Sequence, residues 1–305
     1  MKVHRQQSER PAPEGVYASL ITPRRDGEVE VDLGAMLEVL DFVAARGVSG
    51  VVLFGSTGEF LHFTPDERSR FVGLAAKRSR VPVLVNVSHS TLDGAVALAE
   101  ETAGAGASGV LAMPPYFYKY DTDSIRTFYL ELASRVAKWT PVYLDNVPAF
   151  TNPLSVELAE ELLRSGSFAG IKESSGDWTS LERLLTLPVR VLCGDETLHA
   201  RARRAGAVGG VSGLATAVPE LMAGIDRAAV ANDDAALLGL EAQLGSLLAW
   251  VPRFPSPVLI REACALRGIK TGGPALPLGE EGRKALDEFR SWFKDWIKVI
   301  ERDWK

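Results

Sequence analysis

The amino-acid sequence predicts an α/β protein built as a (β/α)8 barrel with a C-terminal helical appendage. Short apolar runs alternate eight times with segments whose apolar residues recur at helical spacing. The runs are apolar along their whole length, which is typical of parallel strands buried on both faces. The segments after the eighth run have the pattern of helices, and no segment with the composition of a linker separates them from the barrel. A doubly wound sheet is the alternative that this alternation leaves open.

Each apolar run is bounded by turn residues, and most are followed by a polar residue that can cap a helix. The clearest cap is Thr64, with Pro65 at the first helical position and Glu67 where a capping box places it. The expected strands are residues 16–22, 51–54, 81–87, 109–116, 141–148, 168–172, 189–196 and 206–213. The expected helices are residues 33–46, segments that begin near 64, 90–93 and 177–178, residues 124–139, 155–164 and 198–204, and in the appendage 219–231, 235–250, 257–267 and 280–304.

These elements divide the chain into three parts. Residues 1–15 are polar and lack the apolar core of a secretory signal, so we expect a flexible N-terminal lead-in. Residues 16–217 form the expected barrel. Residues 218–305 form the expected helices packed on it, since their apolar stripe needs a partner surface.

Composition excludes several function classes. Of the 305 residues, 46% are apolar and 24% are charged, which are ordinary values for a globular protein. A net charge of −5 provides no electrostatic footprint for nucleic acid or for an anionic membrane, and no uninterrupted apolar segment is long enough to span one. The two cysteines, Cys193 and Cys264, suit a reducing compartment. We therefore expect a cytoplasmic protein that binds neither nucleic acid nor membrane.

Barrel enzymes carry their chemistry at the carboxyl ends of the strands. Lys172 ends the sixth apolar run and is followed by a Glu-Ser-Ser-Gly turn. A lysine desolvated at such a position can lose its proton and attack a carbonyl carbon. The alternative is a lysine that extends from the strand end into solvent or pairs with Glu173.

The other strand ends offer hydroxyls, amides and a few carboxylates. Residues 55–58, Gly-Ser-Thr-Gly, can expose successive N–H groups that hold a carboxylate, although a plain turn has the same composition. The four histidines form no cluster with metal-ligand spacing, and Cys193 is typical of a core residue. We expect no metal and no cofactor, and a carbinolamine mechanism fits the groups that are present.

Five motifs then converge on one family. They are GSTGE at 55–59, PPYF at 114–117, DNVP at 145–148, GIKESSGD at 170–177 and GAVGGVSG at 206–213. In this order, the chain from about residue 16 to 277 resembles the dihydrodipicolinate synthase / N-acetylneuraminate lyase family. The resemblance implies a class I, pyruvate-type aldolase barrel, usually a homotetramer, with Lys172 as the Schiff-base lysine. It also implies that Ser56 and Thr57 hold the keto-acid carboxylate and that Val211 lines the same pocket.

The chain departs from the family pattern at three functional positions. Asp145 stands where the family usually has a proton-shuttling tyrosine, and Phe117 replaces the tyrosine that completes the synthase's relay across a subunit contact. Phe150 stands where the synthase has an arginine that binds its aldehyde substrate. The resemblance is therefore closer to the sugar-acid lyase and 2-keto-3-deoxy sugar acid branches than to dihydrodipicolinate synthase itself.

Asp145 has two alternative roles. Lys172 and Asp145 end adjacent expected strands, and an ionised carboxylate favours the ammonium form of a neighbouring lysine. A buried Asp145 can carry a proton and act as general acid and base. Alternatively, the position has lost its catalytic role, which leaves a slow or repurposed enzyme.

The remaining site residues leave the substrate open. Asp195 and Glu196 can accept hydrogen bonds from substrate hydroxyls, as the corresponding pair does in sugar-acid lyases, or merely stabilise a solvated helix N-terminus. Against the sugar interpretation, one side of the pocket is expected to be aromatic and to favour an aldehyde with an apolar part. The aromatic residues are Tyr116, Phe117, Tyr118 and Phe150.

The leading prediction is a lyase that makes or breaks a C–C bond between pyruvate and an aldehyde or sugar-acid substrate. A dehydratase of a 2-keto-3-deoxy sugar acid would use the same Schiff base. The hypothesis from a different class is a keto-acid-binding barrel that keeps Lys172 but has lost turnover, which the changes at Asp145 and Phe117 favour.

Overall fold

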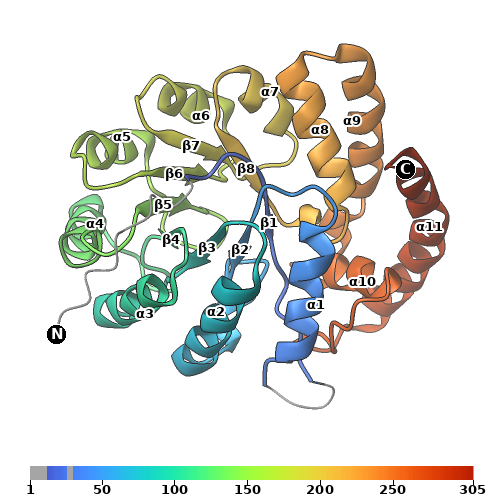
Figure 1. The fold of residues 1–305 in the computed structure, drawn as a ribbon, viewed down its shortest axis with the longest axis horizontal. Helices are drawn as coiled ribbons and strands as arrows, with labels where there is room; N and C mark the ends of the chain where they lie inside the picture. The colour runs from blue at the N-terminus through green and yellow to red at the C-terminus, as the bar shows by residue number, and fades with distance from the viewer. Residues whose placement is uncertain (1–11, 26–29, 305) are drawn as a thin grey trace.

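Eight parallel strands close into a barrel in the structure, a computed structural model that describes residues 12–25 and 30–304 (Figure 1). The strands are β1 (Gly15–Ser19), β2 (Gly50–Leu53), β3 (Val83–Asn86), β4 (Gly109–Ala112), β5 (Val142–Asn146), β6 (Gly170–Glu173), β7 (Arg190–Cys193) and β8 (Gly209–Ser212). They pair in chain order, and β1 pairs with β8 to close the ring. The predicted (β/α)8 barrel is confirmed, and the doubly wound alternative is wrong.

Helices surround the strands and continue past the barrel. The helices of the barrel are α1 (Leu33–Ala44), α2 (Pro65–Arg78), α3 (Leu92–Ala105), α4 (Thr122–Val136), α5 (Val156–Arg164), α6 (Trp178–Leu185), α7 (His199–Arg204) and α8 (Pro219–Ala231). The later helices are α9 (Asp234–Leu248), α10 (Val258–Leu266) and α11 (Glu280–Trp304), and the 3-10 turns are η1 (Phe60–His62), η2 (Leu214–Thr216) and η3 (Val251–Arg253). Figure 1 shows α8 to α11 gathered on one side of the ring, next to α1.

Local sequence signals explain where the helices begin. Thr64 caps α2 as predicted: its side chain accepts from the Glu67 N–H, and the Glu67 carboxylate accepts from the Thr64 N–H in return. Side-chain caps also begin α1, α3, α4, α5, α6 and α9, through Asp32, Thr91, Asp121, Ser155, Asp177 and Asp233. Each cap accepts a hydrogen bond from a backbone N–H that has no partner within its helix. The capping residue in the sequence therefore marks where that helix begins.

The strands are shorter than the apolar runs that predict them. The run at 109–116 contributes only Gly109–Ala112 to β4, because Pro114 and Pro115 have no N–H to donate to a neighbouring strand. Where residues of a run remain at the carboxyl end of a strand, they form partly apolar loops there. The residues predicted for the site lie in these loops or, like Lys172, in the last residues of a strand.

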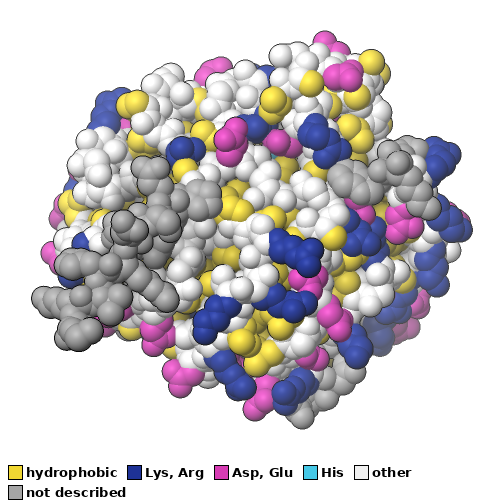
Figure 2. Space-filling view, in the orientation of Figure 1, with side chains coloured by type: hydrophobic (Ala, Val, Ile, Leu, Met, Phe, Trp, Pro, Cys, Tyr) yellow, Lys and Arg dark blue, Asp and Glu magenta, His cyan; other side chains and the backbone are white. Residues whose placement is uncertain are grey.

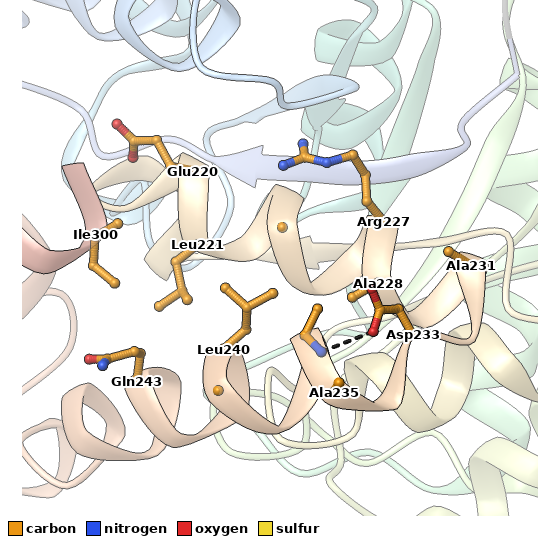
Figure 3. A pocket seen from close by; sticks show the side chains of 13 residues that line it. Glu220, Leu221, Arg227, Ala228, Ala231, Asp233, Ala235, Leu240, Gln243 and Ile300 are labelled. Carbon is orange, nitrogen blue, oxygen red and sulfur yellow. Dashed lines mark hydrogen bonds between the residues drawn. The ribbon is translucent and has the colours of Figure 1, made fainter. Parts of the chain in front are cut away.

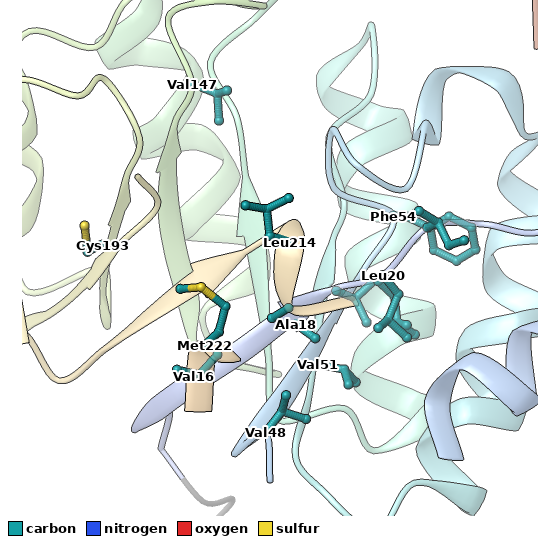
Figure 4. Packing of buried hydrophobic residues seen from close by; sticks show 14 of the residues in the cluster. Val16, Ala18, Leu20, Val48, Val51, Phe54, Val147, Cys193, Leu214 and Met222 are labelled. Atoms are coloured by element: carbon teal, nitrogen blue, oxygen red, sulfur yellow. The ribbon is translucent and has the colours of Figure 1, made fainter. Parts of the chain in front are cut away.

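Two layers of core form because successive strand residues point to opposite faces. Inside the barrel, an apolar floor is made by Tyr17, Val52, Leu84, Leu111, Tyr143, Leu192 and Val211. Between strands and helices, Val16 and Ala18 of β1 and Leu20 just after it pack beside Val51 of β2 (Figure 4). The floor fills the middle of the barrel, and Asn86, Asp145 and Lys172 follow it toward the carboxyl ends of their strands.

The predicted N-terminal lead-in at 1–15 lies largely outside the described residues. The predicted boundary between barrel and appendage at 217–218 stays a prediction.

In the C-terminal part, Asp234–Arg253 is long and apolar enough, by length and composition, to cross a membrane. The helix in that segment, α9, packs against α8 and buries Leu237, Leu244 and Leu247. Lys and Arg are interspersed with Asp and Glu on the face shown in Figure 2.

Candidate active site

Lys172 and Asp145 form a buried ion pair at the carboxyl ends of β6 and β5. The two residues are direct partners in the register of these strands, so their side chains enter the barrel together. Lys172 Nζ lies 2.8 Å from Asp145 Oδ1, and only 10% and 1% of the two side chains is exposed. Glu173, the alternative partner, is instead bound to the Asn146 amide and to the Ser175 N–H. Lys172 therefore points to the barrel interior rather than to solvent.

Asn86, the last residue of β3, holds the other side of the carboxylate. Its Nδ2 donates to Asp145 Oδ2 at 3.2 Å, and its own Oδ1 accepts from the Ser88 N–H at 2.9 Å. Both carboxylate oxygens of Asp145 thus have a partner. Sequence reasoning missed Asn86, although a polar residue inside the apolar run 81–87 is a signal that could have found it.

Tyr129 of α4 completes the surroundings of this carboxylate. Burial, followed by the charge of Asp145, raises the pKa of Tyr129 well above its ordinary value. The phenol therefore stays protonated and donates to the Ala112 carbonyl at 3.1 Å. Lys172 is then the nearest group in this cluster that can exchange a proton with Asp145.

A cavity of about 270 Å³ opens in front of Lys172. Its walls include most of the predicted site residues: Ser56, Thr57, Phe150, Lys172, Glu196 and Val211. These come from β2, β5, β6, β7 and β8 or from the loops that follow them. The structure brings together a lysine amine, hydroxyls and a carboxylate, as the strand-end argument predicts.

The loop with Ser56 and Thr57 follows β2 and has a tightly constrained backbone. Phe54 and Glu59 on either side adopt left-handed φ angles of 56° and 52°. A Cβ on Gly58 would lie 3.0 Å from both the Leu20 carbonyl oxygen and Phe54 Cα, so a larger residue would displace the backbone. The loop is therefore held in one shape, which a pre-organised anion site requires.

Arg261 fixes this loop from the helical appendage. Its Nη1 lies 2.9 Å from Glu59 Oε2, and only 4% and 7% of the two side chains is exposed. The same guanidinium also donates to the carbonyls of Thr22 and Thr271, so it joins the segment after β1, the loop and the segment after α10. The appendage is therefore part of the site's support.

Glu196 lines the cavity and also organises the end of β8. Its Oε1 accepts from Ser212 Oγ at 2.8 Å and from the Gly213 N–H at 3.0 Å. Asp195 is not among the residues that line the cavity. Its Oδ1 accepts from the Thr197 N–H at 2.8 Å within the same turn. Binding of substrate hydroxyls by either residue stays a prediction.

The two predicted phenylalanines lie in different places. Phe150 lines the cavity and is 57% exposed. Phe117 is 87% exposed, has a φ of 73°, and does not line the cavity of its own chain. Its ring packs edge-on against Tyr118, with 4.9 Å between centroids. The role predicted for Phe117 in substrate binding is therefore not supported by contacts within one chain.

Comparison with known proteins places this geometry in a family. The model of the dihydrodipicolinate synthetase family matches residues 12–295. The chain belongs to this family. A 4-hydroxy-tetrahydrodipicolinate synthase of Methanoculleus marisnigri is 30% identical over 285 residues, which cover 91% of this chain and 97% of the relative. The family resemblance predicted from the five motifs is confirmed.

Solved structures agree on the fold. Dihydrodipicolinate synthase of Aquifex aeolicus superposes with a TM-score of 0.86 at 24% identity, over 93% of this chain and 98% of that one. A sialic acid aldolase of Ruminococcus gnavus superposes with a TM-score of 0.84 at 18% identity, over 94% of this chain and 99% of that one. Members of the dihydrodipicolinate synthetase family are lyases that act on keto acids and aldehydes, and the chain has their pyruvate-aldolase barrel.

The appendage contributes a wall that sequence reasoning missed. Leu248, Ser256 and Ile260 line the Lys172 cavity, although they follow the last barrel strand in sequence. Their apolar spacing is that of any packed helix, so no local signal distinguishes them. Only the folding of α9 and α10 back over the barrel places them here.

A larger cavity, of about 630 Å³, lies between α8 and α9, away from Lys172 (Figure 3). Its walls are mostly small and apolar residues, with Arg227, Asp233 and Gln243 among them and Glu220 at the edge. That carboxylate is already paired with Arg267 at 2.7 Å and Arg46 at 3.0 Å. Among residues 12–25 and 30–304, no three or more His, Cys, Asp or Glu gather where they could hold a metal ion.

Proposed function

We propose that the chain is a class I Schiff-base lyase that cleaves or forms a C–C bond between pyruvate and an aldehyde through Lys172. The observation that carries this proposal is the buried Lys172–Asp145 pair beside the cavity, with 2.8 Å between Nζ and Oδ1. A lysine needs its free amine to attack a carbonyl, and a hydrogen-bonded carboxylate can accept the proton that leaves.

The residues then have the following roles. With its proton on Asp145, the Nζ lone pair forms a bond to C2 of pyruvate, and the keto oxygen leaves as water. The resulting iminium withdraws electrons, so a proton at C3 passes to a base and an enamine forms. C3 then bonds to the aldehyde carbon, the new alkoxide takes up a proton, and water releases the product from Lys172. Cleavage is the same sequence in reverse.

Ser56 and Thr57 are proposed to hold the carboxylate of the keto acid. Both line the cavity with Lys172, on a loop whose shape is fixed by left-handed backbone and by the Glu59–Arg261 pair. Hydroxyl and N–H donors on such a loop suit a carboxylate. Val211 of the barrel floor faces the same cavity and suits the apolar C3 end of pyruvate.

A second candidate is a keto-acid-binding barrel without turnover, which the ion pair itself favours. A carboxylate 2.8 Å from Nζ stabilises the ammonium form, and that form cannot attack a carbonyl. Dehydration of a 2-keto-3-deoxy sugar acid is the alternative within the Schiff-base chemistry. It would share Lys172 and differ in the bond that breaks.

Borohydride trapping tests the Schiff base directly. Incubation with millimolar pyruvate and sodium borohydride is expected to leave one reduced pyruvyl group on the peptide with Lys172, read by mass spectrometry. Screening pyruvate with a panel of aldehydes then separates the candidates by their aldol products. No adduct on Lys172 would sink the lyase proposal, and an adduct without any aldol product would favour the binding barrel.

We also propose a cytoplasmic homo-oligomer, a tetramer by family resemblance. Phe117 and Tyr118, 87% and 67% exposed, form an aromatic patch that is typical of a protein contact. Both cysteines are free and buried, as suits a reducing compartment. Light scattering is expected to give four times the chain mass, and the variant Phe117→Ser is expected to shift this toward smaller species. A monomeric wild type would contradict the proposal.

A further inference from the structure

We infer that a second cavity beside Lys172 is the acceptor subsite and selects an aldehyde with an uncharged aromatic arm. This inference rests on the proposed lyase function and deepens it. The second cavity has a volume of about 240 Å³. It shares three wall residues with the Lys172 cavity: Ser56, Phe150 and Ser256. The two cavities are therefore neighbours, and these three residues stand where an arm of a molecule bonded to Lys172 would enter the second one.

The second cavity is apolar on most of its surface. Beyond the shared residues, its walls are largely Phe60, Leu61, Met113 and Tyr116. The Phe60 and Tyr116 rings meet edge to face, with 5.6 Å between centroids and 83° between planes. Aromatic pairs of this kind are favourable, and a third ring can pack against them in the same way.

Phe150 is the residue that an aromatic acceptor would cover. Its ring is 57% exposed although it lines both cavities. A large apolar side chain gains from burial, and the described chain leaves this one open on the cavity side. An acceptor arm that lies against Phe150 removes that exposed surface while its aldehyde carbon stays near Lys172.

The charges around the second cavity are already paired. Glu59 and His62 line it, but Glu59 is held by Arg261 at 2.9 Å, and His62 Nδ1 lies 2.8 Å from Arg24. Burial raises the pKa of Tyr116, so its phenol is neutral. Neither lysine nor arginine is among the described residues that line this cavity. An acceptor carboxylate or phosphate would lose water there without gaining a cation.

A polyhydroxylated acceptor would also find few partners. Thr151 is buried, and its hydroxyl already lies 3.1 Å from the carbonyls of Val147 and Asn152. Ser56 and Ser256 stand at the junction rather than deep in the second cavity. The hydroxyls of a sugar chain would be desolvated against apolar walls, which disfavours binding.

Initial rates with pyruvate and three aldehydes test the inference: benzaldehyde, glyceraldehyde and succinic semialdehyde. The wild type is expected to use benzaldehyde with a kcat/KM about ten-fold or more above the other two, a typical discrimination for a fitted apolar pocket. Phe150→Ala is expected to lower kcat/KM for benzaldehyde about ten-fold and to leave glyceraldehyde within about three-fold. Phe150→Leu keeps apolar volume without a ring. Its kcat/KM for benzaldehyde is expected to lie between those of the wild type and Phe150→Ala.

Two controls separate this inference from the function on which it rests. Pyruvate trapping on Lys172 is expected to persist in the Phe150 variants, since they keep the amine that forms the Schiff base. Leu238→Ala on α9, at a side chain that is 75% exposed and lines neither cavity, is expected to match the wild type. Failure of trapping in the wild type would overturn the lyase proposal and this inference with it. Normal trapping with a preference for glyceraldehyde or succinic semialdehyde, or without turnover of any of the three, would overturn the inference alone.

Discussion

Replacement of Lys172 by methionine is expected to abolish the trapped pyruvyl adduct and to lower turnover by about 10⁴-fold or more, because the nucleophile is lost. Lys172→Arg is the matched control: it keeps the positive charge beside Asp145 but has no amine that can be freed of its proton. Both variants are expected to be inactive with pyruvate and an accepted aldehyde. An adduct that survives in either variant would show that another lysine is the nucleophile.

The same two variants are expected to differ in stability. Methionine leaves the Asp145 carboxylate, 1% exposed, without a cation, and loss of one partner of a buried pair costs about 3–5 kcal/mol. Lys172→Arg keeps a cation and should lose less. The double variant Lys172→Met/Asp145→Asn should recover part of the loss, because no buried charge remains. Urea unfolding of the three variants measures this, and equal stability of all three would show that the pair is hydrated rather than buried.

The fold could be predicted because its signals are local. Each strand is an apolar run, and six of the eight barrel helices begin at a residue whose side chain caps them, such as Thr64 and Asp177. Such signals depend on a few neighbouring residues, so a sequence shows them without tertiary information. The strand ends were less predictable, because apolar residues such as Met113 continue past the last ladder hydrogen bond into the loops.

The site could be predicted in part, for a related reason. Lys172, Ser56 and Thr57 are found by asking which residues end the strands, because the closed barrel brings all those ends together. Asn86 was missed because its value lies in a hydrogen bond to Asp145, 59 positions along the chain. Arg261 was missed for the same reason, since its partner Glu59 is 202 positions away. Pairings at such distances are set by packing, not by local pattern.

Phe117 is a residue that the sequence singled out but whose position in the structure it did not predict. Its motif predicts a place at the substrate, yet the structure places an exposed ring with left-handed backbone outside both cavities. A non-glycine residue in that conformation is strained and persists only where something holds it. The proposed subunit contact is such a constraint, and it links the Phe117 position to assembly rather than to the pocket of its own chain.

Asp145→Asn is expected to lower kcat by about 10²–10⁴-fold while a pyruvyl adduct still forms at Lys172. The amide keeps the size of the carboxylate but cannot carry a proton to and from the reacting atoms. Steady-state rates with an accepted aldehyde measure kcat, and borohydride trapping at saturating pyruvate measures the adduct. Asn86→Ala is the matched control, since it removes the hydrogen bond that orients Asp145, together with the one from the Ser88 N–H, and leaves the carboxylate in place. Its effect on kcat should be smaller.

The substitution also tests how the carboxylate is held. Asp145 accepts at both oxygens, from Lys172 Nζ at 2.8 Å and from Asn86 Nδ2 at 3.2 Å. An asparagine offers one acceptor and one donor, so either Lys172 or Asn86 must face an N–H group, at a cost of about 1–3 kcal/mol. Reduced stability with unchanged kcat would therefore mean that Asp145 only stabilises the fold around Lys172, and the acid–base role would be wrong. Reduced kcat at nearly unchanged adduct formation is the result that assigns Asp145 the proton, because a positioning residue alone would weaken both.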